Sequence, residues 1–197
     1  YERQGYIPSL IFRQELIDWA NIFVRQYVSP KIPFIIQIRN ACSYNSDRNS
    51  NIDAWLQLFR FCQNRFPIKF IIICAKSEID ERLRGFDNVI IAKDFDTTVD
   101  QDLALIDCAA AYMGVSSGPS TVALFGEKPY SIMNAHLEYL PKNLLVKYPW
   151  GENFLFSNEH QRWIHGTETY QSLIGELSLL FALVDVSEWQ AFDSTSN

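Results

Sequence analysis

The chain of 197 residues lacks a long apolar run, a cluster of basic residues and closely spaced cysteines. Its longest apolar stretches, such as residues 70–74 and 179–184, fall far short of the roughly 20 residues that span a bilayer. Lys and Arg number 17 against 23 Asp and Glu, a net charge of -6, and no basic run could neutralise the phosphates of a nucleic acid. We therefore expect no membrane span and no nucleic-acid partner.

Metal-binding patterns are missing as well. The four cysteines are far apart in the sequence, and the histidines lack the i,i+4 spacing of a zinc-binding helix. This pattern predicts no metal site and reduced thiols, as in a cytoplasmic protein. The chain begins at Tyr1 rather than Met and shows no signal-peptide pattern, so we expect a piece of a longer protein.

What is present is an alternation of apolar strands and amphipathic helices. Apolar residues make up 48% of the chain, enough for a folded domain with a sizeable core. Short apolar runs predict strands at 33–39, 68–74, 88–92, 111–115 and 130–133. Helical spacing predicts helices from Ser9 to about residue 29, from 52 to about 66, and at 78–83, 100–110, 119–125 and 167–184. Asn51 is a candidate N-cap for the second of these helices. Residues 137–166 show no regular pattern.

Buried strands separated by helices are typical of a parallel sheet covered on both faces. The prediction is an α/β fold: a Rossmann-like, doubly wound parallel sheet of about five strands with flanking helices. We expect a leading helix in residues 1–30, a nucleotide-binding domain in 31–184 and a tail in 185–197. If the strand order is 3-2-1-4-5, the first and fourth strands are neighbours where the order reverses, which is where ligands bind in such sheets.

The loop after the fourth strand has the composition of a phosphate-binding loop. Gly118 would allow a close backbone approach, and Pro119 suits the first position of a helix whose amino end attracts anions. The nearby hydroxyl groups belong to Ser116, Ser117, Ser120 and Thr121. We interpret this loop as a candidate diphosphate site, with an ordinary capped helix as the alternative.

Arg39 ends the first predicted strand and Asn40 follows it, at the same predicted crevice. A guanidinium at the end of an apolar strand is costly to bury unless it is paired, and its planar fork fits phosphate oxygens. The alternative is an arginine that reaches solvent or pairs with Asp47 or Asp94. Together with the serine-rich loop, Arg39 favours an anionic ligand.

Residues 113–130, with the sequence MGVSSGPSTVALFGEKPY, resemble the donor-site segment of GT-B glycosyltransferases, particularly the heptosyltransferase-like enzymes. The first-strand sequence Gln37-Ile38-Arg39 is similar to the His-x-Arg element of fucosyltransferase-type GT-B enzymes, with Gln37 in place of the histidine. The resemblance covers about residues 33–133 and, more loosely, residues 154–180, where 159–163 and 166–168 look similar. It implies the carboxyl-terminal, donor-binding half of a two-domain bacterial enzyme of glycan biosynthesis.

The resemblance also implies a location, partners and roles. The protein would be cytoplasmic, either free or peripheral at the inner membrane. The co-substrate would be a nucleotide-diphosphate sugar, with no other cofactor and no metal. The acceptor would be a glycan or another molecule, held with an amino-terminal GT-B domain or a partner chain. Arg39 would be the catalytic group that stabilises the leaving diphosphate. Asp94 and Phe95 are candidates for contact with the nucleoside, although a solvated loop is the favoured interpretation of Asp94.

Two other readings of the sequence remain open. The first is a non-catalytic Rossmann-like module that binds a nucleotide or a protein partner. The second is a hydrolase, because Gly114-x-Ser116-x-Gly118 matches a nucleophile elbow between a strand and a helix. Its catalytic partners would be Glu138 with His160 or His165.

Overall fold

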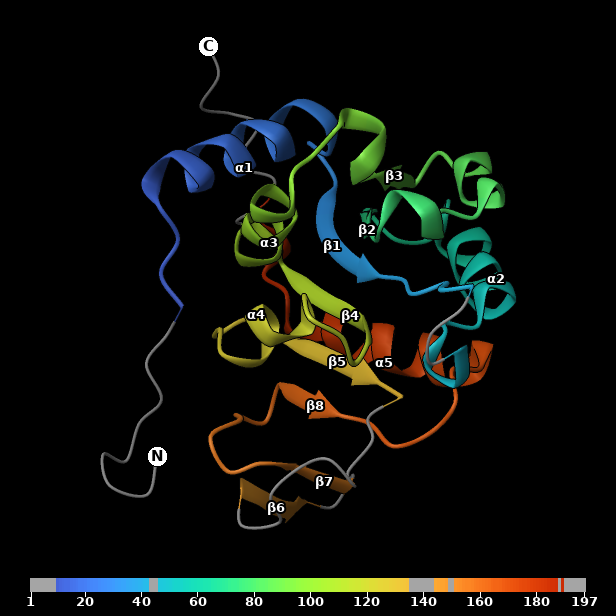
Figure 1. The fold of residues 1–197 in the computed structure, drawn as a ribbon, viewed down its shortest axis with the longest axis vertical. Helices are drawn as coiled ribbons and strands as arrows, with labels where there is room; N and C mark the ends of the chain where they lie inside the picture. The colour runs from blue at the N-terminus through green and yellow to red at the C-terminus, as the bar shows by residue number, and fades with distance from the viewer. Residues whose placement is uncertain (1–9, 43–45, 135–143, 149–150, 188, 190–197) are drawn as a thin grey trace.

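The structure is a computed structural model that describes residues 10–42, 46–134, 144–148, 151–187 and 189. Within these ranges six strands form one parallel sheet in the order β3-β2-β1-β4-β5-β8 (Figure 1). The predicted order 3-2-1-4-5 is confirmed, and a sixth strand extends it beyond β5. The strands are β1 Ile32–Gln37, β2 Ile68–Ile73, β3 Val89–Ile91, β4 Ala111–Val115, β5 Tyr130–Met133 and β8 Gln161–Trp163.

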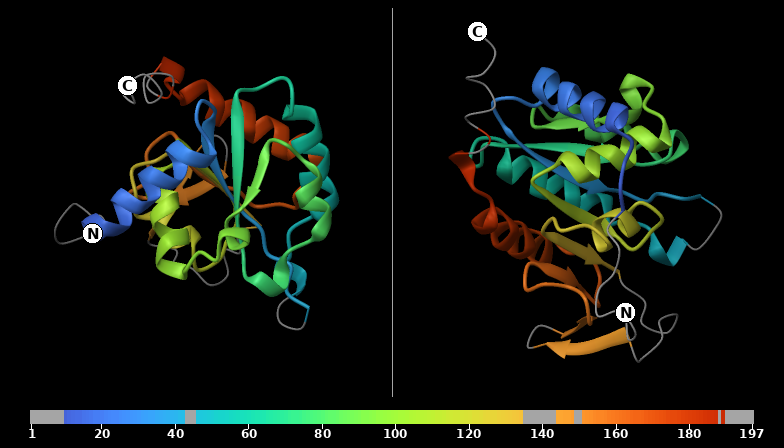
Figure 2. Two further views of the ribbon diagram at one scale, coloured as in Figure 1. Left: turned by 90° about the horizontal axis from the view of Figure 1, so that it is seen from above. Right: turned by 90° about the vertical axis from the view of Figure 1, so that its left-hand side faces the viewer.

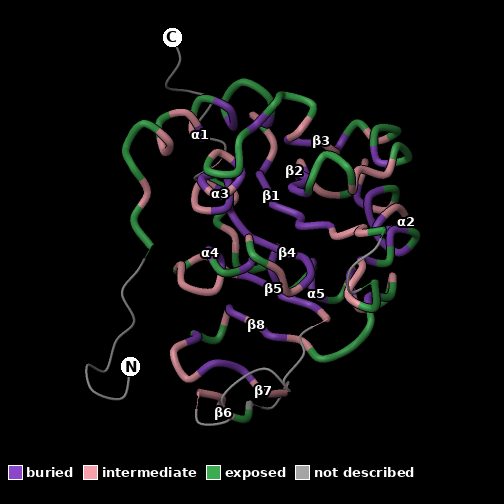
Figure 3. Tube along the Cα trace, viewed as in Figure 1, coloured by how far each residue is buried: buried purple, intermediate pink, exposed green. Residues whose placement is uncertain are grey.

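Helices cover both faces of the sheet, as the apolar strands predict (Figure 2). The α-helices are α1 Gln14–Tyr27, α2 Ile52–Cys62, α3 Val99–Cys108, α4 Ser120–Leu124 and α5 Tyr170–Leu183. Phe34 and Ile36 of β1 share one core with α2 and α5, whereas Ile35 shares the other core with α1, α3 and α4. Figure 3 shows the central strands as buried along their whole length. The fold is therefore an α/β Rossmann-like domain.

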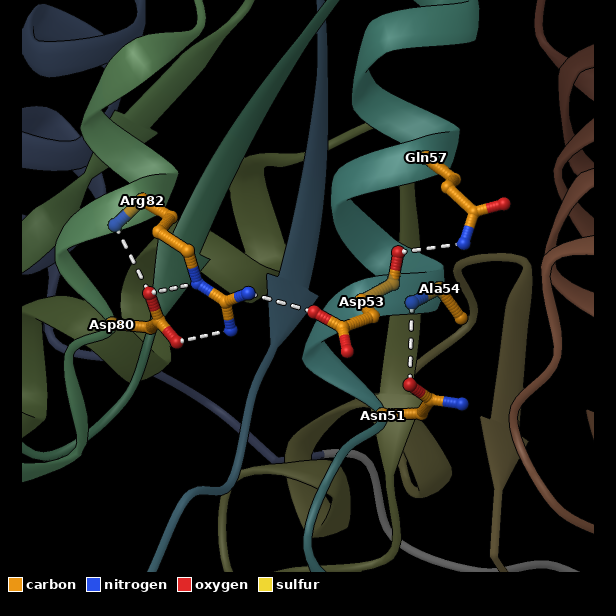
Figure 4. Close-up of polar contacts among 6 residues, drawn as sticks. All are labelled: Asn51, Asp53, Ala54, Gln57, Asp80 and Arg82. Carbon is orange, nitrogen blue, oxygen red and sulfur yellow. Dashed lines mark hydrogen bonds and ion pairs between the residues drawn. The ribbon is translucent and has the colours of Figure 1, made fainter.

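An asparagine begins α2 as the sequence predicts. Asn51 is the N-cap, and its side-chain oxygen accepts a hydrogen bond from the Ala54 amide at 3.2 Å (Figure 4). On the neighbouring loop, Arg82 donates to Asp80 and reaches across to Asp53 of α2 at 2.7 Å. The exposed Arg82–Asp53 pair joins the β2–β3 connection to α2, and exposed pairs of this kind add little stability.

The predicted helix at 78–83 is wrong. The chain instead forms two 3-10 turns, η2 Lys76–Glu78 and η3 Glu81–Gly85, with extended backbone at Ile79 and Asp80 between them. The Asp80 carboxylate accepts a hydrogen bond from the Arg82 amide at 3.0 Å. This local bond begins a new turn and prevents one continuous helix.

Other boundaries also differ from the prediction. Helix α1 begins at Gln14, after an extended Arg13, rather than at Ser9, which lies outside the described residues. Strand β1 ends at Gln37, so Arg39 follows the strand instead of ending it. Pro119 is the N-cap of α4 and not its first helical residue. The division into a leading helix, a domain and a tail stays a prediction.

The segment predicted to be irregular contains three strands in its described part. The antiparallel pair β6 Leu145–Tyr148 and β7 Gly151–Phe154 forms a small second sheet, and β8 joins the edge of the main sheet. Strand β8 is anchored by a polar contact: Arg162 forms an ion pair with Glu176 of α5 at 3.1 Å, and Glu176 also accepts a hydrogen bond from Ser131 at 2.7 Å. These groups tie α5 to the β5–β8 edge.

Candidate functional site at the carboxyl ends of the strands

A pocket of about 360 Å³, which we call the Arg39 pocket, lies at the carboxyl ends of β1, β2 and β4. This is the point where the strand order reverses, since β1 pairs with β2 on one side and β4 on the other (Figure 1). The residues in its wall are Gln37, Arg39, Ile73, Cys74, Ala75, Glu78, Lys93, Val99, Asp102, Leu103, Ser117, Gly118 and Pro119. The fold thus places a pocket where the sequence predicts a ligand site.

Four of the predicted site residues meet in the wall of this pocket. They are Arg39, after β1, and Ser117, Gly118 and Pro119, after β4. The remaining predicted diphosphate residues lie beside the wall without lining it: Asn40, Ser116, Ser120 and Thr121. The two loops therefore converge as their positions in the sequence predict.

The predicted nucleoside residues lie at a different hollow. Asp94 and Phe95 line a pocket of about 280 Å³ beside β3. Asp94 binds the guanidinium of Arg84 at 2.6 Å, and the Phe95 ring packs 4.5 Å from that of Tyr27. The structure does not bring them together with the Arg39 pocket, and their nucleoside role stays a prediction.

Hydrogen bonds within the β4–α4 loop fix its shape. The Ser117 amide donates to Ser120 Oγ at 3.1 Å, and the Ser120 hydroxyl donates back to the Ser117 carbonyl oxygen at 2.6 Å. The Gly118 amide forms no hydrogen bond in the described part of the chain. Helix α4 has only five residues, so its dipole is small and adds little to anion binding. Within this loop, Gly118 offers a free backbone donor.

Gly118 is not required by the packing of the chain. A Cβ atom built at Gly118 would meet no atom within 4 Å, so the space above it is open. The situation is the reverse at Gly114 in β4, where a Cβ would lie 2.4 Å from the carbonyl oxygen of Gln37. The glycine that allows two strands to approach is therefore Gly114, whereas Gly118 faces free space at the pocket.

Gln37 joins β1 to this loop. Its side-chain Oε1 accepts a hydrogen bond from the Ser117 hydroxyl, and its Nε2 donates to the Ile38 carbonyl oxygen at 3.1 Å. Gln37 is buried, so these bonds satisfy its amide where water has little access. The contact orients the hydroxyl of Ser117 at the edge of the pocket.

The far wall of the pocket holds a buried ion pair. Lys93 Nζ lies 2.6 Å from Asp102 Oδ2, and the Thr97 hydroxyl donates to the other oxygen of Asp102 at 2.5 Å. Because Lys93 and Asp102 neutralise each other, this pair adds little net charge to the pocket, and Glu78 is a further carboxylate in the same wall. Burial also raises the pKa of the neighbouring Cys74 thiol to about 12, so the thiol stays protonated and unreactive at neutral pH.

One residue at this site has no signal in the sequence pattern. Arg48 of η1 Ser46–Arg48 donates a hydrogen bond from Nη2 to the carbonyl oxygen of Ser116, 68 residues away in sequence. The loop between β1 and α2 is polar and has no periodicity that would mark Arg48. Its role depends on a contact that only the folded chain reveals.

The positions of the proposed catalytic residues give little support to a hydrolase. The Ser116 hydroxyl makes no hydrogen bond to a described residue, and its amide donates to Met133 at 3.0 Å. The carbonyl of His160 accepts from the amide of Tyr130 at the start of β5, so His160 lies at the amino end of the strands, opposite Ser116. His165 is exposed beyond the end of β8, and Glu138 lies outside the described residues.

In the described ranges, no group of three or more His, Cys, Asp or Glu side chains is arranged to hold a metal ion. Among the helices that the structure describes, none is long and apolar enough to cross a membrane.

Comparison with known proteins gives a structural likeness and no sequence match. No protein-family model and no curated protein matches the sequence significantly. The fold is similar to the solved structure of the E. coli ADP-heptose lps heptosyltransferase II, with a TM-score of 0.58 and 14% sequence identity. The likeness covers 89% of this chain and 54% of the heptosyltransferase chain, so this chain spans about half of that protein. At this identity the likeness concerns the fold alone: the chain is a Rossmann-like α/β domain whose fold is similar to about half of that structure.

Proposed function

We propose that this chain is the donor-binding domain of a GT-B glycosyltransferase and binds a nucleotide-diphosphate sugar in the Arg39 pocket. The observation that carries the proposal is the convergence of Arg39 with the Ser117–Pro119 loop at the carboxyl ends of β1 and β4. A guanidinium and an unused backbone amide suit the oxygens of a diphosphate. The structural likeness to a heptosyltransferase supports the same assignment.

The chemistry expected of this site is stabilisation of a leaving group. When the glycosidic bond breaks, the nucleoside diphosphate gains negative charge. Arg39 and the Gly118 amide are donors that could stabilise this charge without a metal ion. An amino-terminal domain or a partner chain would bind the acceptor, a glycan or another molecule, and complete the active site.

Nucleotide binding can be tested directly on this chain. We expect UDP, GDP or ADP, or one of their sugars, to raise the melting temperature, because a ligand that binds only the folded state stabilises it. Calorimetry then measures the affinity of each compound that does so. If none binds at millimolar concentration, the donor-site proposal fails, and the non-catalytic interaction module becomes the better account.

Replacing Gly118 with leucine is expected to weaken binding of that ligand by at least about tenfold while leaving stability almost unchanged. A Cβ at this position meets nothing in the chain, so the new side chain would occupy only the space next to the pocket. Calorimetry gives the affinity and thermal unfolding the stability. The matched control is Gly85→Leu, since a Cβ at Gly85 also meets no atom within 4 Å and Gly85 lies outside the pocket. Equal affinities for wild type and Gly118→Leu would place the ligand elsewhere.

A further inference from the structure

Arg48 supplies a second guanidinium beside the β4–α4 loop. Its Nη2 binds the carbonyl oxygen of Ser116, the residue just before the three loop residues that line the pocket. Because the contact joins η1 to the end of β4, Arg48 is held next to the loop that we propose binds the donor. The guanidinium of Arg48 is thus part of the surroundings of this site.

Among the described residues, the bond to Ser116 is the one hydrogen bond that the Arg48 side chain makes. Its Nε is buried and has no hydrogen-bond partner, and no described carboxylate forms an ion pair with this side chain. A buried donor without an acceptor is costly, and native structures seldom leave one in place without a reason. An anion at the loop would provide the missing acceptor and neutralise the charge.

The loop between β1 and α2 holds Arg39 and Arg48 at its two ends. The Ser50 amide donates to the carbonyl oxygen of Arg39 at 2.8 Å, and the Arg39 amide donates to Ser50 Oγ at 3.1 Å. Asn49 closes the loop further, since its side chain both accepts from and donates to the backbone of Ala41. The two arginines therefore belong to one closed loop, and both lie at the segment that begins with Ser116.

We infer that Arg48 is a second anion-binding residue of the donor pocket and that, with Arg39, it selects ligands with two phosphoryl groups over ligands with one. A single phosphoryl group can occupy one guanidinium fork, whereas a diphosphate can occupy two. The inference rests on the proposed function, because it assumes that the donor's diphosphate binds at this loop. It adds Arg48 to the residues of the proposed donor site and gives a reason why the site would prefer diphosphates to monophosphates.

The test is calorimetry with inorganic pyrophosphate and inorganic phosphate, and with the diphosphate and monophosphate of whichever nucleoside binds best. We expect wild type to prefer the diphosphate at least about tenfold. Arg48→Gln is expected to weaken diphosphate binding by about 10- to 100-fold and monophosphate binding by much less, which removes the preference. Arg48→Lys keeps the charge without the planar fork and is expected to lose part of the preference.

The control variant is Arg65→Gln. Arg65 also donates to a backbone carbonyl oxygen, that of Phe61 at 3.0 Å, but lies beyond the carboxyl end of α2 and outside the pocket. This variant should bind as wild type does. If diphosphates bind and both Arg48 variants keep the wild-type preference, the inference is wrong and the donor pocket stands. If wild type binds no diphosphate, the proposed function itself fails. Should Arg48→Gln not fold, Arg48→Lys decides the question alone.

Discussion

Replacing Gly114 with alanine is expected to lower the free energy of unfolding by about 3 kcal/mol or more. The added Cβ would lie 2.4 Å from the carbonyl oxygen and 2.8 Å from the Cβ of Gln37, distances that force β1 and β4 apart. Gly114 also has a φ of +155°, a conformation that alanine adopts only with strain. Urea unfolding followed by circular dichroism measures the change.

Gly85→Ala is the matched control for this experiment. A Cβ at Gly85 meets nothing within 4 Å and Gly85 is exposed, so the free energy of unfolding should change by less than about 0.5 kcal/mol. A Gly114→Ala protein with the unfolding midpoint of wild type would show that β1 and β4 do not approach as closely as the structure has them. The pocket between these strands would then need another description.

Replacing Glu168 with glutamine is expected to remove a large part of the pH dependence of stability. Burial raises the pKa of Glu168 to about 7, and a hydrogen bond from the Asn51 amide at 2.6 Å offsets part of this rise. The folded chain therefore holds this proton more tightly than the unfolded chain, where the pKa is 4.5. The wild-type free energy of unfolding should fall as the pH rises from about 5 to about 8, by about 3 kcal/mol from this group.

Glutamine is a suitable replacement because it is neutral and can still accept from the Asn51 amide. Glu168 Oε1 and the indole nitrogen of Trp55 are both buried, and neither makes a well-formed hydrogen bond. The variant should match wild type near pH 5 and exceed it near pH 8, as urea unfolding at both values would show. If the free energy of unfolding changed with pH by the same amount in the two proteins, Glu168 would not be buried and protonated as described. Other titrating groups cancel in this comparison.

Strands buried on both faces could be predicted from the sequence because burial requires a short apolar run. The bounds of β4 and β5 agree with the prediction to the residue, and Asn51 caps α2 as expected. The strand order could be predicted because right-handed crossovers allow few other arrangements. This order places the carboxyl ends of β1 and β4 side by side, where the pocket lies. The meeting of Arg39 with the loop at Gly118 followed from this order alone.

Other features depend on contacts between distant parts of the chain. Strand β8 is short and contains Gln161 and Arg162, so no apolar run marks it; it is held by pairing with β5 and by Glu176. Arg48 lies in a polar loop, and its contact with Ser116 spans 68 residues. Neither periodicity nor composition reports such contacts. The prediction of a helix at 78–83 was wrong for a local reason. The hydrogen bond from the Arg82 amide to the Asp80 side chain begins a separate 3-10 turn and overrides the helical pattern.

The central claim is that Arg39 binds the diphosphate of a nucleotide sugar at the carboxyl ends of β1 and β4. The most direct measurement is calorimetric titration of wild type and Arg39→Ala with the nucleoside diphosphate that binds best. We predict a loss of affinity of about 10- to 100-fold in the variant, since a charge-assisted pair of hydrogen bonds is removed. Thermal unfolding of the ligand-free variant checks that it is folded. An Arg39→Ala protein that binds the diphosphate as tightly as wild type would contradict the account.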